Sequence, residues 1–200
     1  MPRQPDPDLE DRILKAAQML WKRGGDKSLT MRAVARAAGT NTPAVYRRFK
    51  DRKELVRGLL LRTIVRIGKG FQAGETIEEM AEVYVNYALD DPHEYELFYN
   101  YASEFAPPKK SGRPSPIREV RPNFALLERR LAERLGGSPE DHTRRALAIW
   151  ALMHGTTMLL LQRAVVGHDE ELRSSGRDAL KALLNGAAEF SGQINKGVKR

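Results

Sequence analysis

Short polar, aromatic and cationic side chains are concentrated between residues 40 and 53, in an order that could serve recognition of duplex DNA. The short side chains come first, as Thr40, Asn41, Thr42, Pro43 and Ala44, and Tyr46, Arg47, Arg48, Lys50 and Lys53 follow. Residues at the start of a recognition helix meet base edges, and later residues reach phosphates. In this order Asn41 could read an adenine, and Pro43 or Ala44 the methyl group of a thymine.

Two short helices with a tight turn between them would position these side chains. Thr30 can cap the first helix, and Gly39 suits a left-handed residue just past its end. Pro43 fits the first position of a second helix, in which Val45 and Phe49 form one narrow apolar stripe. The pattern predicts a helix-turn-helix, whereas a plain helical hairpin with a solvated basic face would not require this order of side chains.

The distribution of charge supports this interpretation. Residues 1–60 hold 14 Lys or Arg and 7 Asp or Glu, a net of +7, whereas the whole chain carries +8. Almost all of the excess therefore lies in the segment with the predicted helix-turn-helix. Such a local positive field attracts the phosphate backbone of DNA.

Residues 9–57 resemble the N-terminal DNA-binding domain of the tetracycline-repressor (TetR) family. The resemblance is carried by Ala37-Ala38-Gly39, Tyr46-Arg47-Arg48-Phe49 and Lys53-Glu54-Leu55. It implies that Tyr46, Arg47 and Lys53 hold phosphates. Position alone adds Thr30, Thr42, Arg48 and Lys50 as backbone contacts, and places Thr40, Asn41, Pro43 and Ala44 near base edges. The run from Thr40 to Pro43 departs from the family, which leaves open which bases are read.

The remainder of the chain has helical periodicity throughout, so we predict an all-α fold of about nine helices. The expected organisation is a disordered tail at 1–8, the helix-turn-helix domain at 9–57, a helical ligand-binding and dimerisation domain at 58–191 and a frayed tail at 192–200. A fourth helix from residue 52 should connect the domains. The last helix should run to Phe190.

The sequence contains no cysteine, no signal peptide and no apolar run of membrane-spanning length, which predicts a cytoplasmic protein without a membrane partner. None of the four histidines has the spacing of a metal site, and neither a phosphate-binding loop nor a nucleophile motif is present. We therefore expect no enzyme, no metal and no cofactor.

A second resemblance lies at Trp150, His154 and Gly155, which match the Trp-x-x-x-His-Gly signature of one TetR subgroup. His154 is interpreted as an interior histidine whose ring nitrogens have hydrogen-bond partners within the protein, with ligand contact as the alternative. Gly155 costs a helix about 1 kcal/mol relative to Ala, so close approach of another helix is expected there. The resemblance implies a homodimer through the last two helices, which would place two recognition helices about 34 Å apart on a palindromic operator.

Aromatic and methionine side chains form the last notable set: Tyr84, Tyr87, Phe98, Tyr99, Trp150, Met153 and Met158. They are either plain core or, together with His154, the wall of a pocket for an apolar or aromatic ligand. The prediction is thus a DNA-binding transcriptional regulator, a repressor released by a small-molecule effector. The alternatives are a constitutive dimeric DNA-binding protein without an effector, and a helical enzyme with a basic arm.

Overall fold

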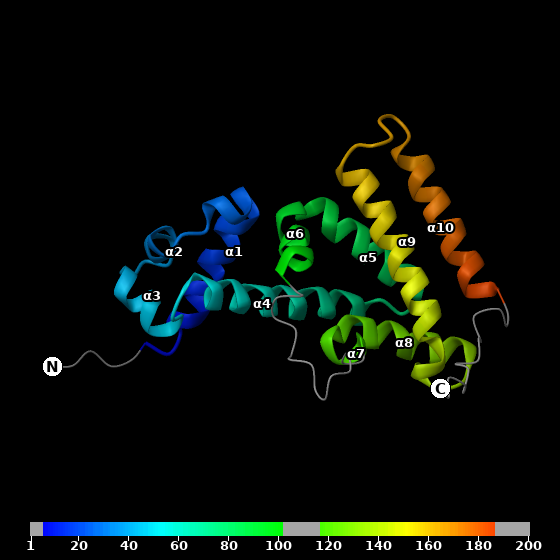
Figure 1. Ribbon diagram of the computed structural model, residues 1–200, viewed down its shortest axis with the longest axis horizontal. Coiled ribbons are helices and arrows are strands. Elements are labelled where there is room, and N and C mark those ends of the chain that lie inside the picture. Colours follow the sequence, from blue (N-terminus) through cyan, green and yellow to red (C-terminus); the bar gives the residue numbers. More distant parts are fainter. Residues whose placement is uncertain (1–5, 102–116, 187–200) are drawn as a thin grey trace, which may run out of the picture. The chain divides into compact units, whose positions relative to one another are not determined.

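The computed structural model describes residues 6–101 and 117–186, and these residues form ten α-helices, one 3₁₀ helix and no strand (Figure 1). The elements are α1 (Leu9–Ser28), α2 (Met31–Ala37), α3 (Thr42–Arg48), α4 (Arg52–Ala73), α5 (Ile77–Asp90), α6 (Pro92–Tyr101), α7 (Ile117–Val120), α8 (Pro122–Leu135), η1 (Pro139–His142), α9 (Thr143–Leu161) and α10 (Asp169–Asn185). The predicted all-α fold is confirmed. The helix that the sequence analysis missed is α7, whose four residues are too few to show a period.

The chain divides into two compact units. The N-terminal unit comprises Met1–Lys69 with Asp90–Ser111, and the C-terminal unit comprises Gly70–Leu89 with Gly112–Arg200. In terms of elements, the N-terminal unit holds α1 to α3, most of α4, and α6. The remaining helices belong to the C-terminal unit. The division differs from the sequence prediction in two respects, because the second domain was expected to begin at residue 58 and to include α6.

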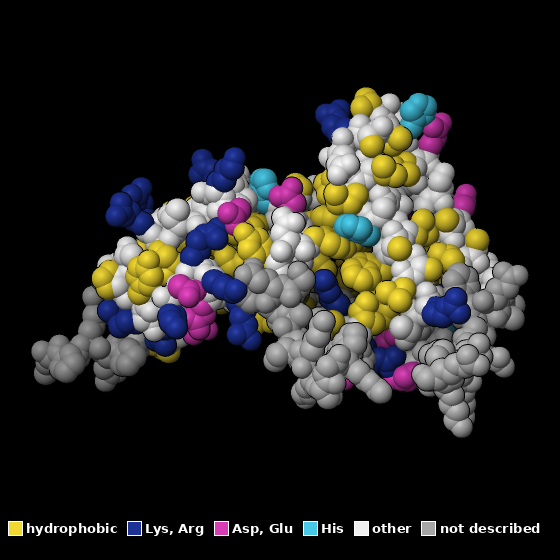
Figure 2. All heavy atoms as spheres, in the orientation of Figure 1, with side chains coloured by type: hydrophobic (Ala, Val, Ile, Leu, Met, Phe, Trp, Pro, Cys, Tyr) yellow, Lys and Arg dark blue, Asp and Glu magenta, His cyan; other side chains and the backbone are white. Residues whose placement is uncertain are grey.

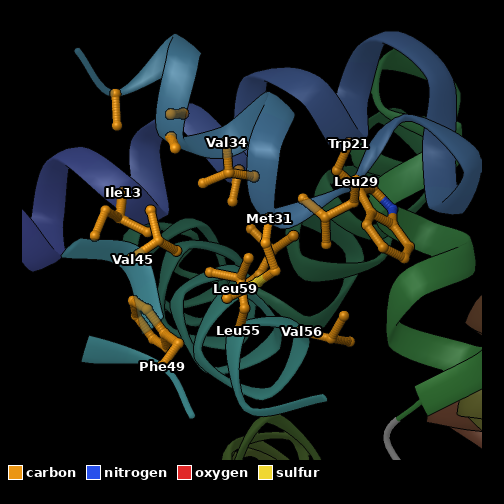
Figure 3. Packing of buried hydrophobic residues seen from close by; sticks show 14 of the residues in the cluster. Ile13, Trp21, Leu29, Met31, Val34, Val45, Phe49, Leu55, Val56 and Leu59 are labelled. Atoms are coloured by element: carbon orange, nitrogen blue, oxygen red, sulfur yellow. The ribbon is translucent and has the colours of Figure 1, made fainter. Parts of the chain in front are cut away.

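The N-terminal unit has one hydrophobic core, to which each of its helices contributes. Ile13 and Trp21 of α1, Val34 of α2, and Leu55 and Leu59 of α4 are at most 2 % exposed. These side chains converge between the helices in Figure 3. Burial of one such side chain stabilises the fold by about 1.5–3 kcal/mol, so this core fixes the three helices that precede α4.

Polar contacts fasten α6 to α1 within this unit. The indole Nε1 of Trp21 donates to the carbonyl of His93 at 2.6 Å, and Gln18 Nε2 donates to the buried carboxylate of Glu94 at 2.7 Å. Arg66 of α4 also binds Glu94. Leu97 of α6 is fully buried in the same core. The contacts of Trp21 and Gln18 with α6 link positions more than 70 residues apart, which explains why sequence periodicity could not assign α6 to this unit.

Local signals set most of the helix ends in the N-terminal half. The regular part of α1 breaks at Gly24 and Gly25, which have non-helical backbone angles, and a further turn then continues to Ser28. Asp51 accepts from the Glu54 N–H at 2.8 Å and so caps α4. Gly68 and Gly70 do not end α4 but lie inside it.

The C-terminal unit is built on α5, α8, α9 and α10. A capping box begins α5, because Thr76 Oγ1 accepts from the Glu79 N–H at 3.1 Å and Glu79 accepts from the Thr76 N–H at 3.2 Å. Buried side chains from all four helices include Ala88, Leu131, Ile149 and Leu184. Helices α9 and α10 approach closely at Gly176, where an added Cβ would meet Thr156 Oγ1 at 3.2 Å.

The predictions for the chain ends are only partly covered by the structure. Residues 6–8 were assigned to a disordered tail, but they form a turn before α1, and Asp6 binds the Arg12 guanidinium at 2.7 Å. The last helix ends at Asn185 with the extended Gly186 as its C-cap, so its predicted end at Phe190 is wrong. The rest of the first tail and the frayed tail at 192–200 lie outside the described residues. Among the described residues, no helix has the length and apolar character needed to cross a membrane.

Candidate functional site

The predicted helix-turn-helix is present as α2, a tight turn and α3. Thr30 Oγ1 accepts from the Ala33 N–H at 3.1 Å and caps α2, and Gly39 has the predicted left-handed backbone, with φ of 64°. Val45 and Phe49 of the second segment are 0 % and 5 % exposed, which confirms the narrow apolar stripe. One side of α3 is thus held by the core, and the opposite side is left at the surface.

Most of the predicted DNA-binding side chains are exposed. The exposed ones are Thr30, Asn41, Pro43, Tyr46, Arg47, Arg48, Lys50 and Lys53, and the half-buried ones are Thr40 and Thr42. Tyr46 is 50 % exposed although it is a large aromatic residue, which places its ring and hydroxyl at the surface of α3. Figure 2 shows Lys and Arg side chains at several separate places on the surface of the helices α1 to α4.

Ala44 is a correction to the predicted site. Its side chain is only 4 % exposed, so its methyl group packs within the protein and is not available to a thymine methyl. The reason is the helical period: Ala44 precedes Val45, and both fall on the side of α3 that the core covers. Pro43, which is exposed, stays available, and it occupies the second position of α3 instead of the predicted first.

Asn41 caps α3, and this structural role limits its predicted role in reading an adenine. Its Oδ1 accepts from the Ala44 N–H at 2.9 Å and caps α3. Reading adenine with both ends of the amide needs this oxygen as well as the Nδ2 group. While the cap is in place, the Nδ2 group is the part of the side chain left for a base.

Arg52 braces the helix-turn-helix and was not among the predicted residues. Its Nε donates to the Leu29 carbonyl at 3.0 Å, and its Nη2 binds Asp26 Oδ1 at 2.7 Å, so it ties the start of α4 to the segment before α2. Hydrogen bonds from Tyr101 and Arg52 lower the pKa of Asp26, which keeps this partner anionic. Sequence reasoning missed this role because it depends on contacts across 23 and more residues.

Further cations lie near the predicted ones. Arg32 and Arg36 of α2 are exposed, and neither was included in the predicted site. The Nη2 of Arg48 donates to the Asp6 carbonyl at 3.1 Å, so this arginine is partly engaged by the segment before α1. The exposed cations of α2 were detectable in the sequence as positions off the apolar face of that helix.

The side chains of the predicted ligand pocket are divided between the two units. Phe98 and Tyr99 are on α6 in the N-terminal unit, where Phe98 packs against the hydrophobic core. The others lie in the C-terminal unit: Tyr84, Tyr87, Trp150, Met153, His154 and Met158. Trp150 packs edge-on against Phe124, with ring centroids 6.1 Å apart, and the Arg121 guanidinium lies 5.5 Å from the Trp150 ring.

A cavity of about 430 Å³ lies in the C-terminal unit between α5, α9 and α10. Met153 is the one member of the predicted pocket set that lines it. The other lining residues are charged, polar, small or aliphatic, and the aromatic criterion could not select them. A cavity of this size is within the range of ligand sites, about 300–1,000 Å³.

His154 and Gly155 are neighbours on α9, and the structure describes the burial of the first and the space around the second. His154 is half-buried, and burial lowers its pKa, which favours the neutral imidazole. Gly155 was expected to admit another helix, and among the described residues an added Cβ would meet no atom outside its own helical turns within 4 Å. No helix in the described part of this subunit fills that place, so approach of a helix from a second subunit stays a prediction. Among the described residues, no group of three or more His, Asp or Glu could hold a metal ion.

An all-α chain that presents an exposed, cationic second helix of a helix-turn-helix is a DNA-binding protein by architecture. Two family models match it: "Bacterial regulatory proteins, tetR family" over residues 13–59, and "Tetracyclin repressor-like, C-terminal domain" over residues 77–183. The chain therefore belongs to the TetR family and is a DNA-binding transcriptional regulator. The resemblance drawn from the sequence is confirmed at this level, and the Trp-x-x-x-His-Gly subgroup stays a prediction.

Solved structures share the fold. One, a protein of unknown function from Rhodococcus sp. RHA1, is 23 % identical with a TM-score of 0.69, over 92 % of this chain and 99 % of that one. The multidrug binding protein EbrR complexed with ethidium is 21 % identical with a TM-score of 0.62, over 90 % and 99 %. A TetR variant from Acinetobacter baumannii AYE in complex with minocycline is 16 % identical with a TM-score of 0.60, over 92 % and 96 %. No curated protein matches the chain.

Proposed function

We propose that the protein is a homodimeric repressor that binds a palindromic operator and is released from it by a small molecule. The observation that carries this proposal is the amphipathic character of α3, whose Val45 side is fully buried while Tyr46, Arg47 and Arg48 are exposed. A helix held by the core on one side and cationic on the other is suited to a DNA major groove.

The residues divide by the part of the DNA they would meet. Tyr46, Arg47 and Lys53 bind phosphates in this proposal, and Thr30, Thr42, Arg48 and Lys50 add backbone contacts. The base edges are left to Thr40, Pro43 and the Nδ2 group of Asn41. Phosphate contacts supply affinity and register, whereas base contacts supply sequence preference.

The proposed dimer uses α9 and α10. Leu147, Ala151, Gly155 and Leu159 are exposed and recur every four residues, so they form one stripe along α9. Figure 2 shows hydrophobic side chains at the surface over these two helices. Small residues in such a stripe let a second helix approach closely. A symmetric pair would then present two recognition helices about 34 Å apart, one for each half-site.

The proposed response to a ligand is supported by the fold and by the cavity in the C-terminal unit. Proteins of the same fold are known in complex with ethidium and with minocycline. The aromatic set at Tyr84, Tyr87, Trp150, His154 and Met158 supplies further candidate ligand contacts. A ligand can release the operator only to the extent that it binds the released conformation more tightly than the bound one.

Selection of binding sites from genomic fragments, followed by measurement of operator affinity, tests the proposal. The wild type should run as a dimer in sedimentation and enrich a palindrome. Gly155→Glu should run as a monomer with weakened operator binding, because the added carboxylate lies in the middle of the apolar stripe. Gln72→Glu adds the same charge at an exposed position of α4 and should change neither property.

A wild-type monomer without sequence preference would refute the proposed dimer and operator. Operator binding that no compound of a small-molecule library weakens would leave a constitutive DNA-binding protein instead.

A further inference from the structure

The cavity between α5, α9 and α10 has an apolar floor. Ala81 and Val85 of α5, Met153 of α9, and Leu180 of α10 line it and are each at most 8 % exposed. Gly176 also lines it, at the point where α10 lies against Thr156. The floor can therefore bury an apolar group of a ligand, and burial of apolar surface is favourable in proportion to its area.

The carboxylates that α5 places around the cavity already have partners. Glu78 binds the Arg134 guanidinium at 2.8 and 2.9 Å. Glu79 accepts from the backbone N–H groups of Glu75 and Thr76 and so belongs to the cap of α5. Glu82 lies 3.6 Å from Arg177. A cationic ligand would have to displace one of these interactions.

The three cations that α10 places on the cavity differ in the partners that they bind. Arg173, Arg177 and Lys181 recur every four residues, so they lie on one face of the helix. Arg177 binds Glu170 at 2.5 Å in addition to Glu82. Arg173, by contrast, makes a 3.3 Å contact with the neutral amide oxygen of Asn86, and in the described part of the chain it has no ion pair with a carboxylate. Lys181 has a 3.5 Å pair with Asp178 in which both side chains are largely exposed, and such pairs contribute little.

We propose that this cavity binds an anionic amphipathic molecule, with its apolar body on the floor and its carboxylate on Arg173. A guanidinium can hold a carboxylate through two parallel hydrogen bonds, which a neutral amide partner such as Asn86 does not replace. Lys181, one helical turn beyond Arg177, adds a positive charge to that of Arg173 on the same face of α10. The inference rests on the proposed ligand response in one respect, namely that this molecule is the effector.

The position of the cavity suggests how binding would reach the dimer. It is bounded by α9 and α10, the two helices of the proposed dimer, and by α5 on the opposite side. A ligand that fills the space changes the packing of α10 against α5. Because α10 belongs to the proposed interface, such a change alters the arrangement of the two subunits. The distance between the two recognition helices then no longer matches the spacing of the half-sites.

Titration calorimetry with decanoate, decanol and decylammonium, each below its micelle concentration, tests the site. We expect decanoate to bind once per chain and decanol at least roughly tenfold more weakly, because the charge-assisted hydrogen bonds are lost. Decylammonium should not bind. Arg173→Gln should lower decanoate affinity roughly tenfold and leave decanol affinity unchanged. Arg129→Gln, at an exposed arginine of α8 outside the cavity, should alter neither.

Each alternative result overturns the inference. Equal affinity for decanoate and decanol would refute an anionic ligand, and decanoate binding that does not respond to Arg173→Gln would refute the location. No binding of decanoate at all would leave the cavity without the proposed ligand class. Operator binding, measured in parallel without any ligand, separates these failures from failure of the proposed function, because it does not depend on the cavity.

Discussion

Replacement of Asn41 separates its structural role from its proposed role at the DNA. Asn41→Ala removes the Oδ1 acceptor that binds the Ala44 N–H at 2.9 Å. Loss of such a cap costs about 1 kcal/mol of stability, which in a chain of this size corresponds to about 2–4 °C in Tm. Asn41→Ser keeps an acceptor at the cap and should melt close to the wild type.

Operator affinity should follow a different order from stability. A folded domain has about 5–15 kcal/mol of stability, so a loss near 1 kcal/mol leaves nearly every molecule folded and able to bind. If the Nδ2 group of Asn41 donates one hydrogen bond to a base, both Asn41→Ala and Asn41→Ser should weaken operator binding about fivefold, or about 1 kcal/mol. The two measurements are thermal unfolding by circular dichroism and fluorescence anisotropy with labelled operator.

Asn100→Ala, at an exposed asparagine within α6, is the matched control and should change neither quantity. If Asn41→Ala melted with the wild type, the cap would contribute nothing. If Asn41→Ser bound the operator with full affinity, Asn41 would have no part in reading DNA.

Three further outcomes test other parts of the molecule. Tyr46→Phe should weaken operator binding about fivefold with unchanged Tm, since it removes one hydroxyl from a half-exposed ring; equal affinity would remove Tyr46 from the site. Lys53→Gln should lower the slope of log affinity against log salt by about one, whereas Lys69→Gln, at the far end of the α4 segment in the N-terminal unit, should leave it unaltered. Burial lowers the pKa of His154 below its unfolded value of about 6.5. The unfolded chain therefore takes up this proton first as pH falls, so stability should decrease as the pH falls through the unfolded pKa of about 6.5, and the decrease should be smaller in His154→Gln. Urea midpoints that fall equally in both proteins would contradict this cause.

The helix-turn-helix could be predicted because its signals are local. The cap at Thr30 and the turn at Gly39 each depend on residues no more than a few positions apart, and the apolar period of α3 is complete within one short helix. What the pattern could not provide was the rotation of α3. The small side chain of Ala44 is compatible with a contact to a base, so its type alone allowed the prediction. Its burial depends on how α3 packs, and the sequence pattern does not give this.

The parts that escaped prediction depend on long-range contacts. The hydrogen bond of Trp21 to the His93 carbonyl joins α1 to α6 across 72 residues, and the apolar periodicity of neither helix predicts it. The cavity is similar, because Val85 and Leu180 meet only after α5 and α10 have packed. The aromatic criterion selected side chains by type, yet Trp150 is engaged with Phe124 and Arg121, and the space was left among smaller residues.

Gly155 connects the energetics of the single chain with the proposed assembly. A glycine in a helix interior costs about 1 kcal/mol relative to Ala, and close approach of another helix was expected as the compensation. Within the described part of this subunit no such helix is present, since an added Cβ on Gly155 would meet no atom outside its own helical turns within 4 Å. The same position lies between Ala151 and Leu159 on the exposed stripe of α9. The described residues of one subunit therefore contain no such compensation, and a second subunit packed along this stripe is the arrangement that would supply it.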